Sequence, residues 1–301
     1  MDKKKTVYFK RSKYRSEDFS INNLPLTRGA QFFDILKNEW KTFLLMGVLL
    51  FIFFIPYLTL DVFYWFIRVN LPSQIASTGG DEAAILEAVQ FTDILYEVLV
   101  IPATLIFIIP IAGISRVLKR LVHGEGLLFK ADFLEGIKMN IFHFLILGFI
   151  YCALRFTTQF IYIYISYMPL IPEIVRGVTT GVLFILFVPI LLFMFAQDSI
   201  YKMNLWINFK NSYQLAIKSI LIMWIFSFLI FGVYFLSYIQ NIILKEGICI
   251  ILVITIVPLY LLAISLYTMS RFDKYINVDY YQEIYRKGLR PYADTHKTDN
   301  L

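Results

Sequence analysis

Residues 43–67 read FLLMGVLLFIFFIPYLTLDVFYWFI, an apolar run that contains a single charged side chain, Asp61. A helix needs about 20 apolar residues to cross the roughly 30 Å hydrocarbon core of a bilayer, so this run is long enough to span a membrane. The whole chain has 301 residues, of which 58% are hydrophobic and only 17% are charged, and this composition lies outside the range of soluble domains. The sequence therefore predicts an integral membrane protein.

Five further apolar runs of similar length follow the first one along the chain. We predict spans at about 43–67, 94–117, 141–164, 174–196, 219–241 and 248–269. The predicted fold is an all-α polytopic membrane bundle of six transmembrane helices. The predicted organisation is a basic N-terminal segment at 1–27, a membrane domain at 28–274 and a tail at 275–301.

The positive charges predict the orientation, because short cytoplasmic loops collect lysine and arginine. Of the 28 Lys and Arg residues, all but four fall in the N-terminal segment, the second and fourth loops, and the tail. The four on the opposite side are Arg68, Arg155, Arg176 and Lys245. Both chain ends are thus predicted to be cytoplasmic. The net charge of +6 then indicates a basic membrane face that attracts anionic lipid headgroups, and no nucleic-acid partner is expected.

One sequence pattern occurs three times, each time directly before an outward span. Large apolar residues at i, i+4 and i+8, which lie on one face of a helix, are followed by lysine. The copies are Phe32, Leu36, Trp40 and Lys41, then Phe129, Phe133, Ile137 and Lys138, then Phe209, Tyr213, Ile217 and Lys218. We predict amphipathic helices at the membrane interface. Three helix-hairpin repeats are one interpretation, and chance similarity in a chain rich in Phe, Ile and Lys is the other.

Three charged residues fall inside predicted spans: Asp61, Glu97 and Arg155. Charges within a membrane are costly and suggest function by default. Counted along their helices, all three lie in the outer half, so we expect an ion-paired cluster. Its functional interpretation is a polar site for a solute or a proton, and its structural interpretation is a pair that fixes the register of the helices.

Proline and aspartate mark the returning spans. Each returning span carries proline, at Pro102 and Pro110, Pro189, and Pro258, and proline usually kinks a helix. Asp198 and Asp273 close the fourth and sixth spans, and nearby lysines are their expected partners.

Several catalytic signatures are missing from the sequence. It contains no glycine-rich phosphate loop ending in Gly-Lys-Ser or Gly-Lys-Thr, no HExxH or CxxC motif and no Gly-x-Ser-x-Gly. We therefore expect no enzyme activity, no catalytic residues, no bound metal and no cofactor.

Residues 121–140, LVHGEGLLFKADFLEGIKMN, carry a resemblance to a known family. Through Phe129, Lys130, Phe133, Lys138 and Asn140, and through Pro56 and Thr59 in IPYLT, the chain resembles the YesL-like family of Firmicute membrane proteins, also called domain of unknown function 624. The resemblance implies a location in the plasma membrane of a Gram-positive bacterium. It also implies a gene that lies among the genes for carbohydrate-uptake ABC transporters and their regulators. The chain departs from the family in its longer basic N-terminus and longer first external loop.

The predicted function is that of an accessory subunit in the membrane. Its expected partners are membrane lipids and the permease or ATPase subunits of a carbohydrate ABC importer, bound through the cytoplasmic surface helices. The candidate docking residues are Gly124, Glu125, Gly126, Phe129, Phe133, Lys138, Phe209, Tyr213 and Lys218. The alternative is an autonomous secondary transporter or channel for a small polar solute, with Asp61, Glu97 and Arg155 as its polar site.

Overall fold

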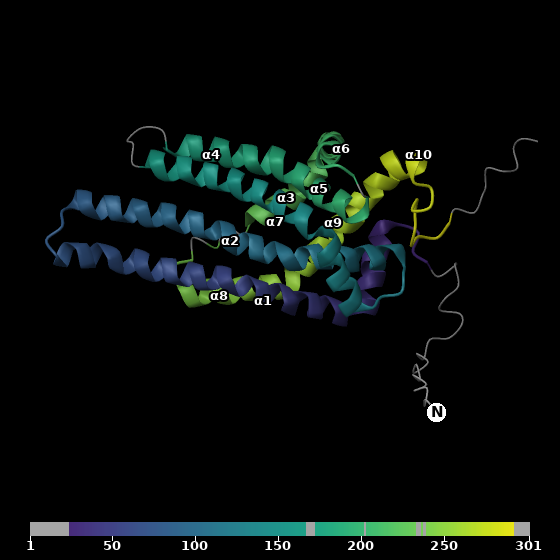
Figure 1. Ribbon diagram of the computed structural model, residues 1–301, viewed down its shortest axis with the longest axis horizontal. Coiled ribbons are helices and arrows are strands. Elements are labelled where there is room, and N and C mark those ends of the chain that lie inside the picture. The colour runs from purple at the N-terminus through teal and green to yellow at the C-terminus, as the bar shows by residue number, and fades with distance from the viewer. Residues whose placement is uncertain (1–23, 167–171, 202, 233–235, 237–238, 292–301) are drawn as a thin grey trace, which may run out of the picture.

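The computed structural model describes residues 24–166, 172–201, 203–232, 236 and 239–291, and helices dominate these ranges (Figure 1). The α-helices are α1 (Arg28–Ser77), α2 (Glu82–His123), α3 (Phe129–Ser166), α4 (Pro172–Val182), α5 (Val188–Ile200), α6 (Leu205–Lys218), α7 (Ile220–Gly232), α8 (Ile242–Ile251), α9 (Val257–Phe272) and α10 (Val278–Tyr280). Three π-helical segments, η3 (Leu183–Phe187), η5 (Leu252–Ile256) and η6 (Asp273–Asn277), join consecutive α-helices. The predicted all-α fold is confirmed. Most of the predicted N-terminal segment and the last ten residues of the tail lie outside the described ranges.

The length and surface of the helices fit a membrane protein. Within the described ranges, five helices are long and apolar enough to cross a bilayer, or six if the bent pair α6–α7 counts as one span. In the most apolar stretch of 18 residues in α1, only 22% is buried within the protein. Its outward side chains include Leu44, Leu45, Val48 and Ile52. Lipid hydrocarbon removes such surfaces from water, so the predicted membrane location is confirmed.

α1 and α2 form a long antiparallel hairpin (Figure 1). The predicted external loop consists mostly of helix: α1 runs through Pro72 to Ser77, and α2 begins soon after a tight turn. Gly79 provides the positive φ of 82° that the turn needs, and the Asp81 side chain caps α2 by accepting from the Ala84 N–H at 2.9 Å. We call this end of the molecule the hairpin end. The opposite end, where α1 begins and α10 lies, is the terminal end.

The predicted surface helices have three different geometries. α1 has a kink at Glu39, where φ is −119° and ψ is 22°, and α6 is bent by 101° from α7. α3 is one continuous helix, so a separate surface helix at residues 129–138 is wrong. Its first turns pack along α2 instead, with Gly136 so close that an added Cβ would lie 2.8 Å from the Gly113 carbonyl oxygen. The packing of α3 on α2 accounts for the continuous helix. The amphipathic pattern of residues 129–138 does not reveal that packing.

The prolines of the fourth and sixth spans each follow a π-helical segment. η3 begins the sequence LFILFVP, which ends at Pro189, and η5 begins LVITIVP, which ends at Pro258. Proline lacks an N–H and crowds the preceding turn, and a wider π turn accommodates both effects. α2, in contrast, passes through both of its prolines as one helix. The shared segment is a further similarity between the second and third of the predicted helix-hairpin repeats.

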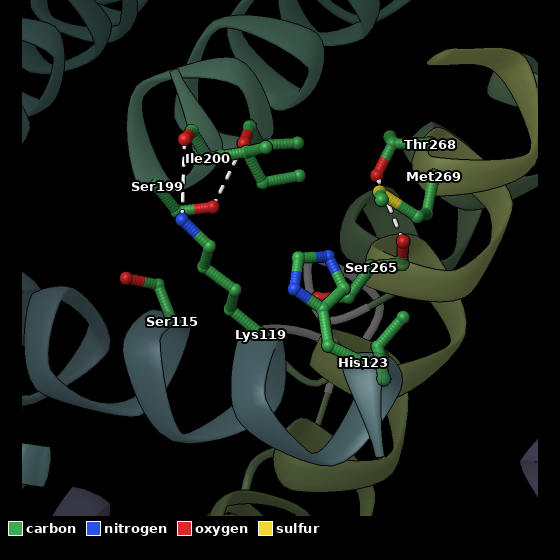
Figure 2. Close-up of a pocket in the computed structure, with 10 residues that line it drawn as sticks. Ser115, Lys119, His123, Ser199, Ile200, Ser265, Thr268 and Met269 are labelled. Carbon is green, nitrogen blue, oxygen red and sulfur yellow. Dashed lines mark hydrogen bonds between the residues drawn. The ribbon is translucent and has the colours of Figure 1, made fainter. Parts of the chain in front are cut away.

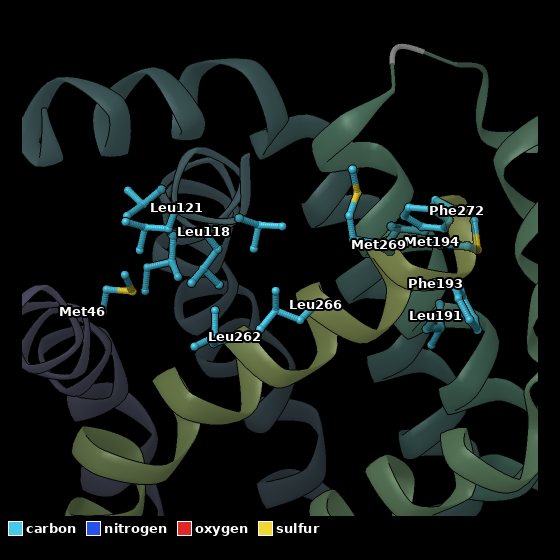
Figure 3. Packing of buried hydrophobic residues seen from close by; sticks show 14 of the residues in the cluster. Met46, Leu118, Leu121, Leu191, Phe193, Met194, Leu262, Leu266, Met269 and Phe272 are labelled. Carbon is cyan, nitrogen blue, oxygen red and sulfur yellow. The ribbon is translucent and has the colours of Figure 1, made fainter. Parts of the chain in front are cut away.

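The hydrophobic core lies around α9, which passes between the α1–α2 hairpin and α5 (Figure 3). On one side the core contains Met46, Leu118 and Leu121 together with Leu262 and Leu266, and on the other it contains Leu191, Phe193 and Met194 together with Met269 and Phe272. α1 also meets η5 directly, because Gly47 packs against the carbonyl of Ile254.

Buried polar contacts close the terminal end. Asp273 pairs with Arg28 at 2.7 Å, and both side chains are about nine-tenths buried. Asp198 contacts His143 at 2.9 Å between Oδ1 and Nδ1. The expectation of lysine partners is therefore wrong for both aspartates. Gln31 adds a hydrogen bond from its amide nitrogen to the Val122 carbonyl at 2.8 Å, which ties α1 to α2.

Candidate functional site

The structure brings Glu97 and Arg155 together in the membrane domain. The two residues lie on the antiparallel helices α2 and α3, and their side chains form a two-pronged ion pair. Arg155 Nη1 lies 2.9 Å from Glu97 Oε2, and Nη2 donates to Oε1 at 3.1 Å. Both side chains are nearly buried, with exposed fractions of 13% for Arg155 and 10% for Glu97. Such a pair has charge-assisted bonds that hold α2 and α3 in register.

Asp61, the third residue of the predicted cluster, has a different cation. Its Oδ2 pairs with the ammonium group of Lys245 on α8, and its Oδ1 accepts a hydrogen bond from Tyr96 at 2.9 Å. The predicted start of the sixth span at residue 248 places Lys245 in an external loop, and this placement is wrong. α8 begins at Ile242 instead, capped by Asn241. Its asparagine cap was the sequence signal that could have placed Lys245 on a helix.

A third ion pair lies further toward the hairpin end, between α1 and α2. Arg68 Nε lies 3.1 Å from Asp93 Oδ1, which also accepts a hydrogen bond from Tyr64 at 2.8 Å. The ring of Tyr64 stacks on Tyr96 with 4.1 Å between centroids, so this pair adjoins the Asp61 contacts. We call the whole group the polar cluster. It consists of Asp61, Tyr64, Arg68, Asp93, Tyr96, Glu97, Arg155, Lys245 and Glu246.

The polar cluster joins four helices, α1, α2, α3 and α8. In a low-dielectric setting its ion pairs gain strength but also lose hydration, so each must be well paired to persist. Chemically it offers carboxylates, cations and phenol hydroxyls in the membrane domain, which are groups suited to binding a proton or a polar solute. The predicted three-residue cluster is thus part of a larger one.

The candidate docking residues of the second copy do not form an open face. Phe133 is buried, and Phe129 is partly buried and stacks on it with 6.0 Å between centroids. Lys138 is exposed on α3. The burial of Phe133 follows from the packing of α3 on α2, and it removes this side chain from any docking surface.

The loop at residues 124–126 lies against the tail of the chain. Gly124 ends α2 with a positive φ of 66°, and a Cβ there would lie 3.7 Å from the Cα of Gly288. Glu125 accepts a hydrogen bond from Lys287 at 2.7 Å, and this contact lowers the pKa of the Glu125 carboxyl group. Apart from its chain neighbours, no atom of the described residues lies within 4 Å of a Cβ built on Gly126. The tail therefore contacts part of this predicted docking loop.

The third copy, α6, matches the predicted surface helix best. Phe209 is 37% exposed and Tyr213 is 49% exposed, while Asn208 and Ser212 are fully buried. Trp206, Phe209 and Tyr213 stack in sequence, with centroid distances of 5.8 and 6.5 Å. Lys218, in the last turn, lies over the ring of Tyr275 at 4.6 Å. α6 thus presents an aromatic stripe outward and a polar face inward.

A small polar cavity of about 20 Å³ lies at the terminal end between α2, α5 and α9 (Figure 2). Lys119 donates to the Ile200 carbonyl at 3.1 Å, and hydroxyl groups of Ser115, Ser199, Ser265 and Thr268 line the space. Burial lowers the pKa of His123, which lies beyond the predicted span at 94–117, to about 4. This histidine is therefore neutral near pH 7, and the cavity has room for about one water molecule.

No protein-family model, curated protein or solved structure matches this chain. The resemblance to the YesL-like family therefore stays a prediction.

Proposed function

We propose that the chain is a membrane-embedded accessory subunit that associates with a transporter through α6 and the groove beside it. The observation that supports this proposal is the inverted polarity of α6. A surface helix of a soluble protein buries its apolar face, whereas α6 buries Asn208 and Ser212 and exposes Trp206, Phe209 and Tyr213. The exposed aromatic face needs lipid or a protein partner to cover it.

The buried face of α6 is held by hydrogen bonds to α5. Gln197 donates from its amide nitrogen to Ser212 Oγ at 2.6 Å, and Asn208 donates to the Met194 carbonyl at 3.1 Å. These bonds lie in a buried setting where breaking them is costly. The aromatic stripe is therefore presented on a fixed helix, and a preorganised surface loses less entropy when a partner binds.

An apolar groove of about 460 Å³ lies between α3, α5 and α6. Its lining includes Leu147, Ile150 and Leu154 of α3, Ile190, Leu191 and Met194 of α5, and Trp206 and Phe209 of α6. This volume is large enough to receive side chains of a partner helix, and aromatic residues commonly dominate the binding energy of interfaces. From the family resemblance, we take the partner to be a carbohydrate ABC importer, through its permease or ATPase subunits.

Removing two aromatic rings of α6 is expected to release the partner. In the double variant W206A/F209A, the recovery of permease and ATPase subunits with the tagged chain should fall at least about tenfold, because truncating one dominant interface aromatic costs about 2 kcal/mol or more. The measurement is affinity purification in mild detergent from the native membrane, followed by mass spectrometry of the named subunits.

The matched control is F63A/F66A, which removes two aromatic rings at the same spacing from α1, where Phe63 is 60% and Phe66 is 58% exposed. This control should retain the partner. The accessory role is refuted if the unmodified chain is recovered without importer subunits, and the α6 interface is refuted if both double variants lose them equally.

The second candidate function is an autonomous secondary transporter or channel for a small polar solute. The polar cluster favours it, because Glu97, Arg155, Asp61 and Lys245 are charged and largely enclosed in the membrane domain. Charged side chains at such depth commonly line solute or ion pathways.

Neutralising Arg155 is expected to abolish transport under this second function. Purified protein in liposomes should take up labelled mono- or disaccharides, and R155Q should lose the uptake because Glu97 then lacks its cation. K130Q serves as the control, since Lys130 is exposed on the same helix as Arg155 and lies outside the polar cluster. Liposomes that show no uptake of any tested sugar by the unmodified protein would count against this function.

A further inference from the structure

The charges of the polar cluster do not balance. Four carboxyl groups, those of Asp61, Asp93, Glu97 and Glu246, face three cations, those of Arg68, Arg155 and Lys245. Arg155 balances Glu97, and Arg68 balances Asp93. Asp61 and Glu246 are left with Lys245 as their common cation, so the described residues of this group carry one excess negative charge when all carboxyl groups are ionised.

Glu246 is the carboxyl group with the poorest hydrogen bonding. The residue is 9% exposed, and its Oε1 is buried and lies 3.7 Å from Lys245 Nζ, which is too long for a good hydrogen bond. Among the residues that the structure describes, Oε1 has no hydrogen-bond partner. A buried carboxylate oxygen without a donor is costly. This oxygen lies beside the same ammonium group that pairs with Asp61.

The Asp61 carboxyl group offers the missing partner. Asp61 Oδ2 and Glu246 Oε1 both lie against Lys245 Nζ, so the two carboxyl groups approach each other beside one ammonium group, although two ionised carboxylates have no hydrogen to share. The remaining groups around this pair are Tyr96, which donates to Asp61 at 2.9 Å, Tyr57, which adjoins Tyr96, and Cys249, one turn along α8 from Lys245. One bound proton would supply the hydrogen and cancel the excess charge.

We propose that Asp61 and Glu246 together form a proton-binding site, in which the two carboxyl groups share one proton beside Lys245. Two carboxyl groups that lie close together favour a state in which only one of them is ionised. The site lies toward the hairpin end, which the charge pattern predicts to be external. Loss of the proton adds repulsion between α1 and α8, so the contact between these helices depends on pH. The site does not depend on the accessory role.

Infrared difference spectroscopy of the purified protein in lipid tests this site. We expect a protonated carboxyl C=O band with the intensity of one group per chain, which shifts in deuterated water and disappears when the pH is raised. E246Q should lose the band. D61N should lose it too, because Glu246 and Lys245 then balance each other. E82Q removes an exposed acid near the start of α2 and should retain the band.

The unmodified chain decides the outcome even if one variant fails to fold. The proposal is overturned if the unmodified protein shows no titratable carboxyl band, or if the band persists in both E246Q and D61N. A band that forms only after sodium is withdrawn at constant pH also overturns it, because a monovalent cation is then the resident ligand.

Discussion

The substitution D273N is expected to destabilise the fold by about 3–5 kcal/mol, because it leaves the Arg28 guanidinium buried without its counter-charge. Arg28 and Asp273 join the start of α1 to the end of α9, with 2.7 Å between Nη2 and Oδ2. Burial lowers the pKa of Arg28, and the hydrogen bond and charge of Asp273 oppose that effect. Asparagine preserves the size of the side chain and an acceptor oxygen, so the loss reports mainly on charge. The measurement is the free energy of unfolding in lipid bicelles titrated with a denaturing detergent.

Two further variants separate the effect of charge from a general effect at this end of the molecule. K287Q breaks the exposed contact with Glu125, and we expect it to cost less than about 1 kcal/mol. In R28M/D273N neither charge remains, so part of the stability lost in D273N should return. A loss in D273N no greater than in K287Q would show that the buried pair contributes little.

The substitution G47A is expected to destabilise the protein by about 1–3 kcal/mol or more, because it places a methyl group where α1 meets η5. A Cβ on Gly47 would overlap the carbonyl group of Ile254. That neighbour is main chain, which has no side-chain rotamer to move aside. The helices must separate, and the buried contacts of Met46 and Leu50 in the adjacent core weaken with them. The same bicelle titration measures the change.

G247A is the matched control. Gly247 lies within α8, and outside its own helix turn a Cβ there meets no atom of the described part of the chain within 4 Å. Alanine has a higher helix propensity than glycine by about 1 kcal/mol, so this variant should be as stable as the unmodified chain or more stable. If G47A and G247A have the same stability, α1 and η5 do not pack as closely as described.

The contacts of the candidate site could be predicted from the sequence only where the position of a residue along its helix was enough to identify its partner. Glu97 and Arg155 lie on consecutive antiparallel helices, so their similar depth correctly suggested that they meet. Asp61 and Lys245 are 184 positions apart, and depth along the chain does not show which faces of α1 and α8 adjoin. Lys245 and Glu246 were also missed because residues 242–247 were treated as a loop.

For the docking residues too, the sequence predicted some features and missed others. The apolar period along α6 correctly predicted a helix with an aromatic stripe, and the identical reasoning for residues 129–138 predicted a separate helix that the structure does not contain. Both stretches have suitable local patterns. α3 buries Phe133 against α2, whereas α6 turns its polar residues toward α5. A pattern identifies the apolar face of a helix, but its neighbours determine whether that face is covered.

The sequence by itself determined that this chain is an all-α membrane protein, because the length and polarity of each segment control whether it can leave water and satisfy its backbone within a helix. The tertiary structure decided where helices bend, that Asp61 meets Lys245 and Glu246, and that α6 exposes its aromatic face. Those outcomes depend on the rotation and packing of helices around one another, which arise from contacts between residues far apart in the chain.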